Sequence, residues 1–253
     1  MNEDDYKTLQ NDCGAIRRML ISSLKTIKSN KGLGIALDSI CTDKCDAGSI
    51  RRERNFVNII EHYDKLIDEN NDPVYDPEPL KEYMNKWDGQ VFIDIMKLDK
   101  TKTVLEIGVG TGRLALKTVP RCKEFVGIDL SSKTIDRATH NLSQYKNARV
   151  ICGDFMTYNF DTSFDVIYSS LTFMHIQEKQ ECINKIYSLL KSKGYLVLSI
   201  DKNQNDCIDY GERKIKIYPD NPDATKKYFI NSGLSLLECI ETEFAYIFVG
   251  SKI

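Results

Sequence analysis

The spacing of apolar residues divides the chain into two parts of different character. In the first part, apolar residues recur every three or four positions, as they do on one face of an amphipathic helix. Such stretches lie at 5–30, 56–67 and 80–96, and Gly89 interrupts the third, where we expect a break. The first two stretches predict a helical N-terminal cap over residues 1–74.

From Thr103 onward, short apolar strands alternate with helical stretches. The strand patterns lie at 104–107, 124–129, 148–152, 164–170 and 195–200. This alternation predicts a mostly parallel sheet with helices on both faces. Two further strand patterns, 234–242 and 244–251, close the chain with only Glu243 between them. Because strands joined by so tight a turn must be antiparallel, the sheet should end with a reversed strand.

A glycine-rich turn follows the first of these strands. Gly108, Gly110 and Gly112 alternate with other residues and lead into a helix that we expect to start at Arg113. Glycine permits backbone angles that other residues resist, and it lets a ligand approach the main chain closely. The start of a helix leaves free N–H groups and a partial positive charge. The turn therefore indicates a binding site, although a tight connection without a ligand has the same pattern.

Two classes of cofactor fit a glycine turn of this kind. The dinucleotide fingerprint is G-x-G-x-x-G with an acidic residue about 20 positions further on. This chain has G-x-G-x-G instead, and Glu106 stands just before the first glycine. The form E-x-G-x-G-x-G resembles the first motif of the class I S-adenosylmethionine-dependent methyltransferases, in which the loop wraps the methionine half of the cofactor. A nicotinamide-dependent oxidoreductase is the alternative, and the glycine spacing disfavours it.

The order of the later elements resembles the same family. Its members have a seven-stranded, doubly wound sheet in which the last strand runs against the others, and the closing strand pair of this chain would give that arrangement. The resemblance implies a Rossmann-like α/β catalytic domain over residues 75–253. It also implies S-adenosylmethionine as the methyl donor and S-adenosylhomocysteine as the product.

Polar residues at the carboxyl ends of the strands are the candidates for the site, because ligands of doubly wound sheets bind there. Asp129 ends the second strand, 21 positions after Gly108, and its carboxylate can accept hydrogen bonds from both hydroxyls of a ribose. Ser131 and Ser132 already supply helix caps, which favours the ribose role for Asp129. NAD would use the same carboxylate, so this residue does not separate the two cofactors.

The resemblance assigns further residues to the cofactor. Asp154 would meet the exocyclic amine of adenine, and Leu130 and Phe155 would flank the ring. Glu106 would fix the glycine loop and meet the methionine ammonium, and Ser169 would offer its backbone to the methionine end. The predicted cofactor residues are Glu106, Gly108, Gly110, Thr111, Gly112, Asp129, Leu130, Asp154, Phe155, Ser169, Trp87 and Tyr63.

Aromatic residues of the N-terminal part are candidates for the wall of the acceptor pocket. Tyr63, Tyr83 and Trp87 lie in helical patterns, where they either cover the cofactor or belong to an ordinary core. The polar, irregular segment 203–219 is the other candidate wall, with a hairpin expected around 213–217.

The sequence after the fourth strand bears on the methyl acceptor. Family members that methylate base amines or glutamine often carry Asn/Asp-Pro-Pro-aromatic there, whereas this chain has Tyr168-Ser-Ser-Leu171, which disfavours those acceptors. The segment 172–176 resembles the small-molecule members, in which a histidine is common. His175 is a candidate general base because imidazole titrates near neutral pH, and a structural role or a cofactor contact is the alternative.

Composition narrows the function further. The chain of 253 residues has a net charge of −2 and no long basic run, which disfavours nucleic-acid binding through a broad electrostatic patch. No stretch approaches the ~20 apolar residues that span a bilayer. The acidic start, Met-Asn-Glu-Asp-Asp, lacks the pattern of a secretory signal, so we expect a cytoplasmic protein.

Eight cysteines raise the question of a metal site. Only Cys41 and Cys45 are close in sequence, and the three histidines are scattered. Because no second pair has metal-ligand spacing, we expect reduced thiols and no zinc site. The preferred interpretation is a methyltransferase acting on the O, N or C atom of a small molecule. A non-catalytic protein that keeps the fold, or one acting on protein or RNA, is an open alternative.

Overall fold

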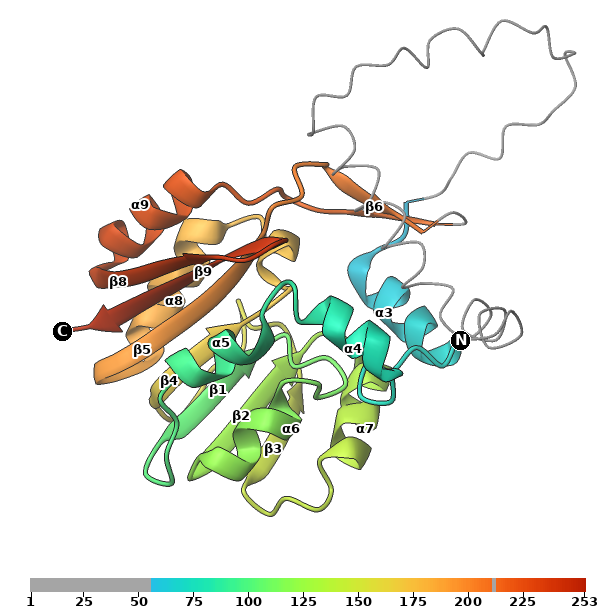
Figure 1. The fold of residues 1–253 in the computed structure, drawn as a ribbon, viewed down its shortest axis with the longest axis horizontal. Helices are drawn as coiled ribbons and strands as arrows, with labels where there is room; N and C mark the ends of the chain where they lie inside the picture. The colour runs from blue at the N-terminus through green and yellow to red at the C-terminus, as the bar shows by residue number, and fades with distance from the viewer. Residues whose placement is uncertain (1–55, 211–212) are drawn as a thin grey trace, which may run out of the picture.

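A computed structural model describes residues 56–210 and 213–253 of the chain (Figure 1). The helix predicted at 5–30 and the pair Cys41 and Cys45 lie outside the described residues.

The centre of the fold is a seven-stranded sheet with the order β3-β2-β1-β4-β5-β9-β8. Its strands are β1 (Thr103–Ile107), β2 (Glu124–Asp129), β3 (Ala148–Cys152), β4 (Phe164–Ser169), β5 (Leu190–Asp201), β8 (Leu234–Glu241) and β9 (Ala245–Lys252). The first five strands pair in parallel, and β9 runs antiparallel to both β5 and β8. The prediction of a doubly wound sheet with a reversed last strand is confirmed.

Helices cover both faces of this sheet. They are α3 (Ile59–Asp68), α4 (Glu78–Met84), α5 (Gly89–Ile95), α6 (Ala115–Thr118), α7 (Ser132–Asn141), α8 (Lys179–Leu189) and α9 (Pro222–Ser232), with short 3-10 turns η1 (Val119–Arg121) and η2 (Phe173–His175). One core packs α8 and α9 against the sheet, and a second packs α5, α6 and α7 against it. Two cores are expected when βαβ crossovers place helices on both faces of a parallel sheet.

Helix boundaries follow local sequence signals in most places. Gly89, with φ +64°, separates α4 from α5 as predicted, and Ser131 caps α7 by accepting from the Thr134 N–H at 3.0 Å. The helix expected from Arg113 begins two residues later and is only one turn long. Pro120 explains its early end, because proline cannot donate the backbone hydrogen bond that would extend the helix.

A small second layer stands beside the sheet. The hairpin predicted around 213–217 is present, with β7 (Lys214–Lys216) paired to β6 (Cys207–Asp209). This hairpin shares a small core of its own with η2 and α3: Met174, Ile208, Tyr210, Ile215 and Ile217, with Val57 and Leu66 packed against them. The helix α3 therefore lies against the hairpin, near the carboxyl ends of the parallel strands (Figure 1). None of the described helices is long and apolar enough to cross a membrane.

Candidate active site

The glycine turn after β1 has the backbone geometry that requires glycine. Gly108, Gly110 and Gly112 have φ angles of +74°, +54° and +96°. A Cβ atom on Gly108 would lie 2.0 Å from Thr172 Oγ1, whereas one on Gly110 would meet nothing within 4 Å. The absence of a side chain at Gly108 therefore allows the segment after β4 to pack against the turn. Gly110 faces open space that a ligand can use.

Asp129 at the end of β2 lies against this turn. Its carboxylate accepts hydrogen bonds from the Gly110 N–H at 3.0 Å and from the Ser131 N–H at 3.1 Å. Burial raises the pKa of Asp129, and the hydrogen bonds from these N–H groups oppose that shift. An ionised carboxylate has about four lone-pair sites, so these N–H groups leave acceptor capacity for hydroxyl donors of a ligand. The structure thus holds Asp129 in one orientation beside the glycine turn.

Glu106 lies on β1, two residues before Gly108, and is buried. The Tyr168 hydroxyl donates a 2.7 Å hydrogen bond to Glu106 Oε2, and the same hydroxyl contacts Thr118 Oγ1 at 2.9 Å. Burial raises the pKa of Glu106 from its ordinary value near 4.5 to about 8, although the Tyr168 hydrogen bond works in the opposite direction. A cation placed beside this carboxyl group would lower its pKa again.

A buried ion pair between Arg113 and Asp88 supports the glycine turn, and the sequence analysis did not predict it. Arg113 Nη1 donates to Asp88 Oδ1 at 3.1 Å, and a second guanidinium nitrogen pairs with Oδ2. Asp88 is fully buried, and it also accepts from the Ser170 hydroxyl at 2.8 Å and from the Gly89 N–H. The pair therefore ties α5, the glycine turn and the end of β4 together. An aspartate before a glycine carries no signal of such a long-range contact.

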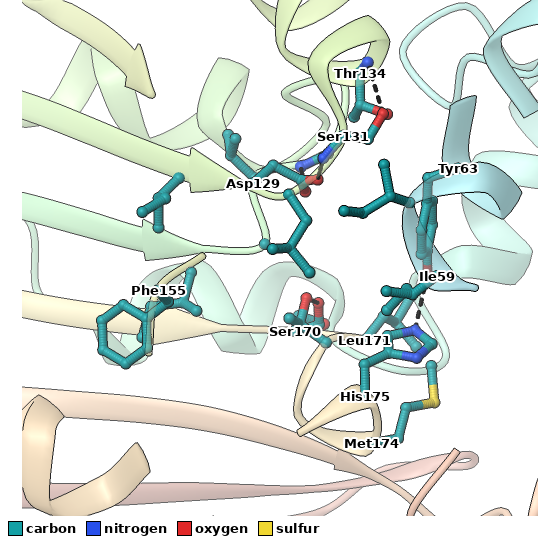
Figure 2. A pocket seen from close by; sticks show the side chains of 18 of the residues that line it. Ile59, Tyr63, Asp129, Ser131, Thr134, Phe155, Ser170, Leu171, Met174 and His175 are labelled. Atoms are coloured by element: carbon teal, nitrogen blue, oxygen red, sulfur yellow. Dashed lines mark hydrogen bonds between the residues drawn. The ribbon is translucent and has the colours of Figure 1, made fainter. Parts of the chain in front are cut away.

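These elements surround one cavity of about 450 Å³, a volume in the range of small-molecule sites. Figure 2 shows Asp129 on one side of this cavity, with Tyr63 and His175 across from it. Ten of the predicted site residues line the cavity: Glu106, Gly108, Gly110, Thr111, Asp129, Leu130, Asp154, Phe155, Tyr63 and His175. The segment 203–219 also contributes to the lining, as expected for a pocket wall, through Ile208, Tyr210 and Tyr218.

Three predicted cofactor residues lie outside the lining. The Trp87 ring packs on Phe244, with ring centroids 4.6 Å apart, and its Nε1–H donates to Asp201 at 3.1 Å. Ser169 is buried and donates through its hydroxyl to the Ile107 carbonyl at 2.9 Å, so the neighbouring Ser170 lines the cavity instead. A Cβ atom on Gly112 would lie 3.5 Å from Leu142 Cγ, so this position packs against Leu142.

Tyr63 and His175 form a hydrogen-bonded pair in the cavity lining, across from Asp129. A hydrogen bond of 2.9 Å joins the Tyr63 hydroxyl on α3 to His175 Nε2 at the end of η2 (Figure 2). Burial, assisted by the positive charge of Lys179, lowers the pKa of His175 to about 4. The imidazole is therefore neutral at neutral pH. Its other nitrogen, Nδ1, is buried and has no hydrogen-bond partner among the described residues.

The helix that carries Tyr63 is fastened at both sides of the cavity. On one side, the Ser131 hydroxyl donates to Asp64 at 2.6 Å. On the other side, Arg213 beside β7 forms a two-point ion pair with Glu69 at 2.6 and 3.0 Å and donates through Nε to His62 Nδ1 at 3.0 Å. These contacts hold α3 over the carboxyl ends of the parallel strands, where it forms the roof of the cavity. Sequence reasoning predicted that the N-terminal helices cover the site but found none of these anchoring pairs.

Comparison with known proteins decides the family. The methyltransferase domain family matches residues 105–198. An uncharacterized methyltransferase of Anoxybacillus flavithermus is 31% identical over 150 residues, which cover 58% of this chain and 67% of the relative. The chain belongs to the class I S-adenosylmethionine-dependent methyltransferases. The alternative of a nicotinamide-dependent oxidoreductase is not favoured.

Other proteins named as methyltransferases share part of the sequence or the fold. A malonyl-[acyl-carrier protein] O-methyltransferase of Priestia megaterium is 30% identical over 142 residues, and the matched region spans half the length of that relative. The solved N-methyltransferase NodS of Bradyrhizobium japonicum, in complex with S-adenosylhomocysteine, superposes with a TM-score of 0.61 at 15% identity. The superposed region covers 76% of this chain and 97% of NodS. Because NodS is only 15% identical to this chain, the likeness to NodS is one of fold alone.

The described residues fit the cofactor of this methyltransferase family. The Asp129 carboxylate has lone pairs left for ribose hydroxyls, and Gly110 leaves open space beside it. The Thr111 Oγ1 and Thr134 Oγ1 atoms are buried in the cavity lining without a hydrogen-bond partner among the described residues, which leaves polar groups for a ligand. S-adenosylmethionine is thus the cofactor consistent with both the family and the cavity.

Proposed function

We propose that this methyltransferase moves a methyl group from S-adenosylmethionine to a small-molecule acceptor inside the cavity between the strand ends and α3. One observation carries the proposal: the glycine turn, Asp129 and the Tyr63–His175 pair all line the same 450 Å³ cavity. The reactive end of a cofactor held at the strand ends would therefore point into the part of the cavity that α3 covers. We also propose that residues 1–74 act as a cap on a catalytic domain formed by 75–253.

The proposed position of the cofactor assigns each part of it to neighbouring side chains. Asp129 would accept hydrogen bonds from both ribose hydroxyls. Leu130 and Phe155 would hold the adenine ring between them, with Asp154 at its amine. The methionine end would then follow the glycine turn toward Glu106. Trp87 is not part of this proposed site, because its side chain packs on Phe244 and does not belong to the cavity lining.

The chain's contribution to methyl transfer is mainly positional. When bound, S-adenosylmethionine supplies a methyl group already activated by a sulfonium centre. The glycine turn and Asp129 would fix its direction, since in-line attack depends on a short, aligned approach of the two reacting atoms. The roof formed by α3 and the β6–β7 hairpin would exclude water from the reacting atoms. His175, neutral at pH 7, would be available to accept a proton from the acceptor.

The charges of the lining argue against one acceptor that the relatives suggest. Two relatives are named for a malonyl group on an acyl carrier protein, and a malonyl group carries a carboxylate. Arg113 is the only arginine or lysine in the described lining of the cavity, and Asp88 already neutralises it. A buried carboxylate without a cationic partner is costly. This arrangement supports a small-molecule acceptor without such a group.

Calorimetric titration tests the proposal. We expect S-adenosylmethionine and S-adenosylhomocysteine to bind with micromolar affinity and NAD not to bind. Asp129→Ala should weaken the binding of both adenosyl ligands by at least about tenfold, because hydrogen bonds to a charged group are lost. The matched control is Asp136→Ala, which removes an exposed carboxylate from α7 and should change nothing. Binding of NAD alone, or equal binding by both variants, would contradict the proposed function.

A further inference from the structure

The part of the cavity under α3 is apolar, and this limits what can bind there. Among the residues that line it are Ile59, Ile60, Leu66, Met174, Ile176 and Ile208. They come from α3, from the segment around η2 and from β6, which are separate from the strand ends that face the cofactor in the proposed function. An apolar wall of this kind favours an acceptor that loses contact with water at little cost.

The charged groups of the lining are poorly placed for a charged acceptor. Arg113, the only lysine or arginine in the described lining, is held in the buried ion pair with Asp88. Glu106, Asp129 and Asp154 lie at the strand ends, and Glu178 is exposed. An anion under α3 would therefore be desolvated without a cation beside it. An ammonium group there would find only the exposed, solvent-screened carboxylate of Glu178 and would be repelled by the sulfonium charge.

The Tyr63–His175 pair offers a hydrogen-bonding contact at this end of the cavity. If the Tyr63 hydroxyl donates to Nε2, its oxygen retains lone pairs that can accept a further hydrogen bond. If Nε2–H donates instead, the tyrosine proton is free to be donated to a ligand. A hydroxyl group matches either arrangement because it both donates and accepts, whereas a carboxylate only accepts and an ammonium only donates.

We infer that the acceptor is an uncharged, largely apolar molecule that presents one hydroxyl group to the Tyr63–His175 pair, an inference that rests on the proposed function. In the transfer, a lone pair of the hydroxyl oxygen forms the new bond to the methyl carbon. The carbon–sulfur bond breaks, and its electron pair stays on sulfur, which becomes neutral. The hydroxyl proton passes to the Tyr63 oxygen while the Tyr63 proton passes to His175 Nε2, which is the acceptor in the first arrangement, and the imidazole later releases one proton to water.

A matched series of small probes tests this inference. The probes are 2-naphthol, 2-naphthoate and 2-naphthylmethylammonium, which share one apolar body and differ in charge. Their binding is measured by calorimetry on the full chain saturated with S-adenosylhomocysteine. We expect 2-naphthol to bind at least about tenfold more tightly than either charged probe. Tighter binding of a charged probe, or no binding of 2-naphthol to the saturated protein, would overturn the inference while leaving the cofactor proposal intact.

Two substitutions locate the polar contact. Tyr63→Phe and His175→Ala should each weaken 2-naphthol binding by about tenfold, the effect of one hydrogen bond, with little change in 2-naphthoate binding. The control is Tyr75→Phe, because Tyr75 is an exposed side chain outside the cavity lining and its hydroxyl donates only to Asn141 Oδ1, at 3.1 Å. Transfer of tritium from labelled S-adenosylmethionine to 2-naphthol should fall with the same two variants. Unchanged 2-naphthol affinity in both variants would overturn the inference, and failure of S-adenosylhomocysteine to bind would overturn it together with the proposed function.

Discussion

Glu106 on β1 and Tyr168 on β4 occupy paired positions in adjacent parallel strands, and the Tyr168 hydroxyl donates a 2.7 Å hydrogen bond to Glu106 Oε2. Both side chains are buried. The sheet register therefore sets the environment of the carboxyl group that precedes the glycine turn. This relationship connects the fold to the pH behaviour of the site.

The free energy of unfolding should depend on pH because of the titration of Glu106. Its pKa rises from near 4.5 to about 8 on folding, so the folded state binds the extra proton between these pH values. Stability contributed by this group is consequently lost as pH rises from about 4.5 to 8. Glu106→Gln should gain at least about 2 °C in Tm relative to the wild type between pH 5.5 and 8.5. Glu124→Gln, at an exposed position of β2, serves as the control. A Tm difference that does not change with pH would refute this account of Glu106.

Cofactor binding should release a proton from the same group. The methionine ammonium placed beside Glu106 would lower its pKa, so at pH 7.5 part of the bound proton would leave. The binding enthalpy of S-adenosylhomocysteine should then vary with the ionisation enthalpy of the buffer, and this variation should disappear in Glu106→Gln. The same buffer dependence in both proteins would show that the proton comes from elsewhere.

The buried Asp88–Arg113 pair should matter far more than an exposed one. Asp88→Asn leaves the capping geometry of α5 nearly unchanged but removes the charge that neutralises Arg113. We expect a loss of about 3 kcal/mol in the free energy of unfolding, measured with urea, because one partner of a buried pair is left alone. The double variant Asp88→Asn/Arg113→Met should recover part of this loss. Lys86→Ala, which breaks the exposed pair with Glu243, should cost less than about 1 kcal/mol, and an equal cost for the two single variants would be incompatible with this view.

The first two glycines of the turn should respond differently to alanine. Gly108→Ala places a Cβ 2.0 Å from Thr172 Oγ1, so we expect poor folding or a large fall in Tm. Gly110→Ala meets no atom within 4 Å, and its φ of +54° should cost about 1 kcal/mol of backbone strain. This second variant should stay folded yet bind S-adenosylhomocysteine more weakly, because the new methyl group enters the open space. Calorimetry on both variants measures this, and undiminished affinity in folded Gly110→Ala would place the cofactor elsewhere.

The attachment of α3 should depend on Arg213. Arg213→Met removes the ion pair with Glu69 and the hydrogen bond to His62 while keeping an apolar side chain in the buried position. Hydrogen exchange of the backbone amides of 59–68 should then become at least about tenfold faster, with little change in β1 and β4, since the opening is local. Lys65→Ala, which breaks only the exposed pair with Glu61, is the control. Exchange that accelerates equally throughout the sheet would indicate global destabilisation instead.

Most of the sheet was predictable because its signals are local. Buried parallel strands such as β1 and β4 are mostly apolar, and a connection of only three residues, 242–244, leaves antiparallel pairing as the only geometry for β8 and β9. The glycine turn was equally visible, because positive φ angles require a particular residue type. The short α6 was less predictable, since Pro120 ends a helix whose first residues are good helix formers.

The contacts that complete the site were not predictable, because they join distant parts of the chain. Arg213 and His62 are 151 positions apart, and neither belongs to a periodic pattern that the other continues. Trp87 shows the opposite error: its aromatic character suited a cofactor contact, yet the fold places it against Phe244. Side-chain partners of this kind depend on the order of strands in the sheet, which a single sequence leaves open.

A crystal structure of the chain with S-adenosylhomocysteine tests the central claim most directly. The account predicts a ligand whose ribose hydroxyls lie within hydrogen-bond distance of the Asp129 carboxylate. Its adenine should lie between Leu130 and Phe155, and its sulfur should point toward the Tyr63–His175 pair. A ligand bound away from the glycine turn, or one whose sulfur points away from α3, would contradict it.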